Sequence, residues 1–162
     1  MNNDRKIIEK AVLHALRGEG AHVEEQHVFE EVDWKLAGAK PGGAPHSLFE
    51  LLSHMIFWQN WVVKWLDGQD PSSPRHASGS WPAVAGPANK KEWDRVVRTF
   101  LTGLSELERW SRDADLLSKG GQKSRLEMLH TIASHNSYHC GQAVLLRQML
   151  GAWPPPSGGL TW

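Results

Sequence analysis

The sequence lacks most of the features that mark a secreted or membrane-bound protein. Cys140 is its one cysteine, so no disulfide can form within the chain and nothing indicates an oxidising compartment. The first residues carry no apolar run of the kind found in signal peptides. No stretch reaches the roughly 18 apolar residues that a transmembrane helix needs. We therefore expect a cytoplasmic protein without a membrane partner.

An excess of charge of either sign is also missing. The 162 residues include 18 basic and 18 acidic side chains, which gives a formal net charge of +0. Proteins that bind nucleic acids usually need a surplus of Lys and Arg to neutralise phosphates, so we expect no nucleic-acid partner. Hydrophobic residues make up 40% of the chain, enough for a core without disulfides. We expect one domain over residues 1–162.

Four segments repeat apolar residues with the 3.6-residue period of an amphipathic helix, and no useful length of chain alternates as a strand does. The predicted helices cover about residues 3–17, 47–67, 89–115 and 124–150. This pattern predicts an all-α protein, a four-helix bundle with long connecting loops.

Local signals support the ends of two of these helices. Ser47 with Glu50, and Ser124 with Glu127, have the spacing of a capping box, in which each side chain bonds the backbone N–H of the other residue. Gly151 stands where a helix C-terminus needs a left-handed residue. The connections are rich in Pro and Gly, and their tryptophans favour docking onto the domain over disorder.

Histidine and tryptophan are unusually frequent, at nine residues each. His135 and His139 are four residues apart on a predicted helix, which places them on one face and one turn apart. They lie in the apolar stripe of that helix. An unpartnered buried polar group costs roughly 1–3 kcal/mol, and one metal ion would satisfy both imidazoles.

A third histidine, His54, lies on the apolar face of the second predicted helix. Three histidine ligands leave a coordination position open for water or substrate, which is the pattern of catalytic rather than structural zinc sites. We expect one divalent ion, zinc or nickel first, with iron or manganese as alternatives, because imidazole suits several transition metals. The competing interpretation of His54 alone is a core histidine that bonds Glu50, one turn earlier.

Two segments resemble the DinB superfamily. The run His135-Asn-Ser-Tyr-His139-Cys-Gly-Gln142, continuing through Gly151 to Pro155, resembles the last helix of that family. The run from Pro45 to Trp58 resembles its second helix, and the Trp81-Pro82 loop is also similar.

The resemblance implies an up-down-down-up four-helix bundle with a metal ion held by His54, His135 and His139. It also implies a small-molecule substrate, such as a low-molecular-weight thiol that receives a transferred group, or else metal-dependent hydrolysis. A homodimer is a further expectation from the family.

Several residues around the predicted site have more than one interpretation. Glu50 is either a partner that orients His54, a general base, or only the capping residue of its helix. Trp58 and Trp61 either line a pocket or pack in the core. Gln142 flanks the ligands, away from the centre of the stripe. Cys140 is expected to be a small buried residue.

The function itself has two competing interpretations. One is a metal-dependent thiol transferase or hydrolase. The other is a non-catalytic metal-binding protein of a stress response, in which a protein group closes the fourth position. A di-iron protein of the ferritin type is excluded, because it needs two inward Glu-x-x-His motifs, and only Glu127 to His130 fits, on a polar face. The acidic and histidine-rich residues 22–31 are expected to be solvated rather than a second metal site.

Overall fold

The computed structural model describes residues 3–113 and 115–159, and it is mostly helical. The four predicted helices are present, and the expected all-α class is confirmed in this respect: α1 (Asn3–Arg17), α3 (Leu48–Leu66), α4 (Lys90–Asp113) and α5 (Arg125–Met149). Their ends lie close to the predicted ones. The predicted end of the third helix, near residue 115, runs past Ala114, which lies outside the described residues.

The predicted helix caps are confirmed. The Ser47 backbone N–H donates to Glu50 Oε2 at 2.7 Å, while the Glu50 N–H donates to Ser47 Oγ at 3.1 Å. Ser124 and Glu127 make the same reciprocal pair at the start of α5. Gly151 ends α5 with φ of 67°, a left-handed conformation that glycine adopts without steric cost.

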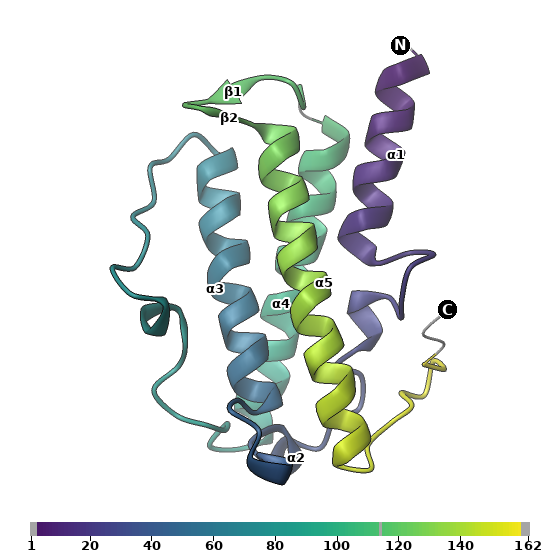
Figure 1. Ribbon diagram of the computed structural model, residues 1–162, viewed down its shortest axis with the longest axis vertical. Helices are drawn as coiled ribbons and strands as arrows, with labels where there is room; N and C mark the ends of the chain where they lie inside the picture. The colour runs from purple at the N-terminus through teal and green to yellow at the C-terminus, as the bar shows by residue number, and fades with distance from the viewer. Residues whose placement is uncertain (1–2, 114, 160–162) are drawn as a thin grey trace.

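The long helices pack along one another. α3 contacts α4 and α5, and α1 contacts the same two helices. Figure 1 shows that α3 and α4 run in the same direction, opposite to α1 and α5, because the chain returns along the molecule between α3 and α4. Two clusters of buried apolar side chains fill the interior, one around Leu52 and Phe100 and the other around Leu66 and Leu129.

The connections contain short elements that the sequence did not reveal. They are the 3-10 helices η1 (Glu25–His27), η2 (Pro41–Gly43) and η3 (Ala77–Ser80), the short helix α2 (Trp34–Ala37), and a hairpin of β1 (Lys119–Gly120) with β2 (Lys123–Ser124). The two strands of the hairpin have two residues each, which is too short to show alternation in the sequence.

The long connection between α3 and α4 is docked rather than loose. Trp81 packs against the core cluster around Leu52, and so does Trp153 in the tail, as expected. Gly86 meets Gly38 so closely that a Cβ on either would lie 2.9 Å from the Cα of the other. The connection is thereby fixed against the segment that precedes α3.

The expectation that residues 22–31 are solvated is wrong for Glu25. Its side chain is 0% exposed, and its Oε2 accepts a hydrogen bond from Asn136 Nδ2 of α5 at 3.1 Å. Burial raises the pKa of Glu25 well above its ordinary value. Cys140 is buried, as predicted, and burial raises the pKa of its thiol.

Across the described residues, none of the helices combines the length and the apolar character needed to cross a lipid bilayer.

Candidate metal centre

Three histidines from two helices converge in the interior. α5 presents His135 and His139 one turn apart, with ring centroids separated by 4.5 Å. α3 brings His54 opposite them, at 5.1 Å from the ring of His135 and 4.8 Å from that of His139. The buried faces of α3 and α5 pack in one core cluster, and the imidazoles of His54 and His139 lie in those faces.

The three side chains can each offer one ring nitrogen to a common point. These atoms all lie within 4.8 Å of one another, and no other such group of His, Cys, Asp or Glu occurs in residues 3–113 and 115–159. Zinc–nitrogen bonds of about 2.1 Å would place two ligand atoms at most about 4.2 Å apart. The widest separation exceeds this limit by up to about 0.6 Å, so binding one ion requires the rings to move closer together.

Hydrogen bonds determine which ring nitrogen of His54 and of His139 carries the proton and which keeps a lone pair. His139 Nδ1 lies 2.7 Å from Gln142 Oε1, and His54 Nδ1 lies 3.3 Å from the backbone carbonyl of Ser80. Because both partners can only accept, each Nδ1 carries the proton and each Nε2 keeps its lone pair. An outer partner on the second ring nitrogen is the usual arrangement around metal-binding histidines.

His135 completes the group from the other side. Its Nε2 lies 3.1 Å from His54 Nε2, so two nitrogens face each other across the same space. Its Nδ1 is buried and has no hydrogen-bond partner among the described residues. Since His54 Nε2 has a lone pair, the Nε2–H of His135 donates to it at this distance, and a His135 that carries its proton on Nδ1 instead would offer a second Nε2 lone pair to a cation. The donor set therefore fits a divalent transition metal.

Burial keeps the three imidazoles neutral. Desolvation, with a smaller effect of His139, lowers the pKa of His54 to about 4. Desolvation also lowers the pKa of His135 to about 4, again with help from His139, and it lowers the pKa of His139 itself. Metal ions bind the neutral imidazole, so the ligands need not lose a proton near neutral pH.

A tryptophan from the connection between α3 and α4 covers the group. Trp81 lies flat on His54, with centroids 4.0 Å apart and planes 9° apart. It also lies flat on His46, at 3.6 Å and 10°. Trp81 thus holds the His54 ring in orientation and links it to a fourth histidine just before α3.

Of the other predicted neighbours, Trp58 and Gln142 contact the ligand rings themselves, and Trp61 contacts Trp58. Trp58 contacts the rings of both His54 and His135 edge to face, whereas Trp61 contacts Trp58. Gln142, which the helix pattern placed away from the centre of the stripe, directly bonds His139.

Glu50 has partners outside the histidine group. Besides capping α3, it forms an ion pair with Lys40 at 2.8 Å. Burial alone would raise the pKa of Glu50, but hydrogen bonds from Lys40 and Ser47 outweigh that effect and lower it. The structure therefore gives this carboxylate a capping and ion-pairing role.

The sequence did not identify two residues beside the three histidines. They are His46 and Trp81, whose ring covers the histidine group. Both lie in irregular segments, where periodicity carries no information about position. The run of Pro and Gly before His46 signals only a turn.

Comparison with known families gives one result. Residues 19–143 match the family described as DinB superfamily, and the match includes His54, His135 and His139. Neither the search of curated proteins nor that of solved structures gave a significant match. Because the family match covers most of the chain, and because it agrees with the resemblance of the two histidine helices, this protein belongs to the DinB superfamily.

Proposed function

We propose that the protein is a metal-dependent enzyme that transfers a group to a low-molecular-weight thiol, with one divalent ion held by His54, His135 and His139. The observation that carries the proposal is the convergence of three imidazoles, two of them with Nδ1 hydrogen-bonded to an acceptor. We propose zinc or nickel as the ion, with iron or manganese as alternatives.

The arrangement of the helices supports this assignment. The directions of α1, α3, α4 and α5 agree with an up-down-down-up four-helix bundle, the architecture that we propose for the domain (Figure 1). Such bundles build metal sites from side chains of facing helices, as α3 and α5 do here.

Each residue around the centre has a distinct task. A divalent ion in this position would lower the pKa of a bound thiol or water, so that the nucleophile forms near neutral pH. Gln142 and Ser80 hold the protons of His139 and His54 on Nδ1 and so aim Nε2 inward. Trp81 and Trp58 shield the rings from water, which strengthens the interactions of any charge that forms between them.

Two alternatives use the same three ligands. In a metal-dependent hydrolase the nucleophile is water instead of a thiol. In a non-catalytic metal-binding protein the fourth position is closed and no exogenous ligand enters. The thiol is preferred here because it is the acceptor that the resemblance to the DinB superfamily implies.

The proposal also covers the location, the oligomeric state and the partners of the protein. We propose that it acts in the cytoplasm as a homodimer on a small-molecule substrate, without nucleic-acid or membrane partners.

Cobalt substitution tests the open position. Cobalt(II) reports its ligands through visible absorption, and a thiolate ligand adds a charge-transfer band in the near ultraviolet. We expect this band when 2-mercaptoethanol is added to the cobalt-loaded protein, and we expect it to persist in His130→Ala, a control on the exposed face of α5. His135→Ala should lose it.

A cobalt-loaded protein whose spectrum does not change with thiol would contradict the transferase and favour the closed, non-catalytic site. A spectrum that responds to acetate or azide but never to thiol would favour the hydrolase.

A further inference from the structure

A pocket of about 360 Å³ adjoins the histidine centre. It lies between the segment before α3, the first turns of α3 and the C-terminal half of α5. Its volume falls within the range of about 300–1,000 Å³ that is common for small-molecule sites. The side chains that matter here are Leu51, Leu145, Leu146, Met149, Gln142 and His46.

The lining selects against charge. No Asp, Glu, Lys or Arg contributes to the pocket, whose other walls are Pro, Gly and Ala of residues 41–45. An ionised group placed here would lose its hydration without gaining a partner, which is unfavourable. Leu145 and Met149 are 57% and 51% exposed, so apolar surface at the mouth remains uncovered in the free protein. The complementary ligand is therefore an uncharged, apolar group.

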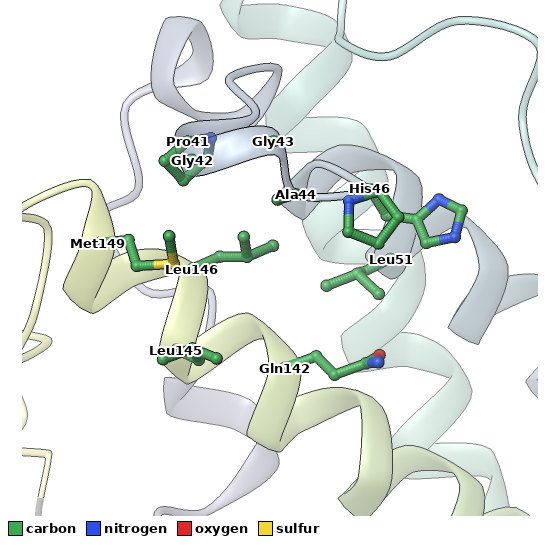
Figure 2. Close-up of a pocket in the computed structure, with 11 residues that line it drawn as sticks. Pro41, Gly42, Gly43, Ala44, His46, Leu51, Gln142, Leu145, Leu146 and Met149 are labelled. Atoms are coloured by element: carbon green, nitrogen blue, oxygen red, sulfur yellow. The ribbon is translucent and has the colours of Figure 1, made fainter.

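Two polar residues join the pocket to the centre. Gln142 lines the pocket and its Oε1 is 2.7 Å from His139 Nδ1. His46 also lines the pocket and stacks on Trp81, which in turn stacks on His54. Figure 2 shows the His46 imidazole and the Gln142 carboxamide at one end of the pocket, with Leu145 and Met149 at the other. One end is thus polar and next to the ligands, and the other end is apolar.

We propose that this pocket binds a short, uncharged alkyl or acyl chain of the molecule whose reactive head lies at His54, His135 and His139. The proposal rests on the proposed function and adds the class of substrate: an amphiphilic small molecule with a metal-binding head and an apolar tail. His46 and Gln142 lie at the junction between head and tail. The occupant is assigned to a small molecule because Gln142 and His46 line the pocket and also contact His139 and Trp81 beside the centre.

A series of hydroxamates tests the proposal by binding alone. The hydroxamate group chelates zinc, and acetohydroxamate, butanohydroxamate and hexanohydroxamate differ only in the length of an uncharged chain. We expect calorimetry on the zinc-loaded protein to show affinity rising by up to about fourfold for each methylene that enters the pocket. Met149→Glu places a carboxylate at the apolar end and should remove most of that gain while leaving acetohydroxamate binding unchanged.

Gln148→Glu is the matched control, because it adds the same charge on the neighbouring exposed position of α5, outside the pocket lining. It should leave the dependence on chain length intact. Leu145→Glu, at the other exposed wall residue, should repeat the effect of Met149→Glu, and melting temperatures show whether either variant is unfolded.

The outcomes separate this proposal from the proposed function. Acetohydroxamate binding with no gain from longer chains, or a gain that Met149→Glu and Leu145→Glu leave unchanged, overturns the pocket assignment and leaves the metal centre standing. Failure of every hydroxamate to bind a protein shown to hold zinc contradicts the open position and both proposals. A change in oligomeric state on Met149→Glu without a change in chain-length dependence identifies the apolar mouth as a contact between two copies and overturns the tail site.

Discussion

Trp81 lies face to face on His54, with ring centroids 4.0 Å apart and planes only 9° from parallel. The residue before it, Ser80, accepts the hydrogen bond of His54 Nδ1 through its backbone carbonyl. The connection between α3 and α4 therefore both covers and orients one ligand of the proposed metal centre. The connection between α3 and α4, which in the sequence indicates only a crossover, is therefore part of the site.

The stack on His54 predicts a role for Trp81 in metal affinity. Removing the ring in Trp81→Ala lets His54 rotate and admits water, so zinc binding should weaken by about tenfold, as is common for partners of ligands. Trp81→Phe keeps a flat ring and should retain most of the affinity. Competition with a chromophoric chelator measures both. Trp34→Ala is the control, since Trp34 packs on the same core cluster; an equal loss there would mean a general effect on stability.

Gln142 predicts a second effect on affinity. Its Oε1 fixes the proton of His139 on Nδ1, so Gln142→Ala should weaken zinc binding by about 10- to 100-fold. Gln142→Glu keeps an acceptor and should bind zinc at least as tightly as the parent. Gln148→Ala, an exposed change on the same helix, should have no effect. Unchanged affinity in Gln142→Ala would show that the hydrogen bond does not orient a ligand.

The buried carboxyl of Glu25 predicts a dependence of stability on pH. Because burial raises its pKa in the folded state, the native protein holds a proton that the unfolded chain releases. This contribution to stability is complete below the unfolded pKa of about 4.3 and is lost as pH rises through the folded value.

Glu25→Gln removes that dependence. An amide can keep the acceptor for Asn136 Nδ2 and also donate to Asn136 Oδ1, which has no partner among the described residues. Urea unfolding at pH 4, 6 and 8 should show the variant gaining on the parent as pH rises. Glu24→Gln, a neighbour bonded to Gln26, is the control. A parent and a Glu25→Gln variant that differ by the same amount at every pH would contradict the raised pKa.

Substitution by alanine is expected to have opposite effects on stability at two glycines, Gly86 and Gly141. A Cβ on Gly86 would lie 2.9 Å from backbone of Gly38, so Gly86→Ala must push the connection away and should cost about 1–3 kcal/mol, as overpacking does. Gly141→Ala meets nothing within 4 Å on α5 and should stabilise by roughly 0.5–1 kcal/mol through helix propensity. Denaturant unfolding measures both, and equal effects would mean that the connection is not fixed at Gly86.

The helices and their caps were predictable because their causes are local. The apolar period locates α3 and α5, and the pairs Ser47 with Glu50 and Ser124 with Glu127 mark where they begin. The convergence of the three histidines follows from the same periodicity, since each lies on an inward face and the faces of packed helices meet.

The surroundings of the histidines were not predictable in the same way. His46 and Trp81 come from segments without a period, and their positions depend on tertiary contacts such as that of Gly86 with Gly38. The burial of Glu25 was not predictable for a related reason. A run of charged residues usually faces solvent, but here one carboxyl is buried against Asn136.

Metal content per chain decides whether His54, His135 and His139 hold an ion. The protein would be purified without an affinity tag, incubated with zinc or nickel, desalted and measured by plasma mass spectrometry. His54→Ala, His135→Ala and His139→Ala would be measured beside it, with His130→Ala as the exposed control. We expect close to one divalent ion per chain in the parent and the control, and loss of the ion in each ligand variant that remains folded. A parent that retains no ion from either metal, or ligand variants that keep theirs, would contradict the assignment of these three ligands.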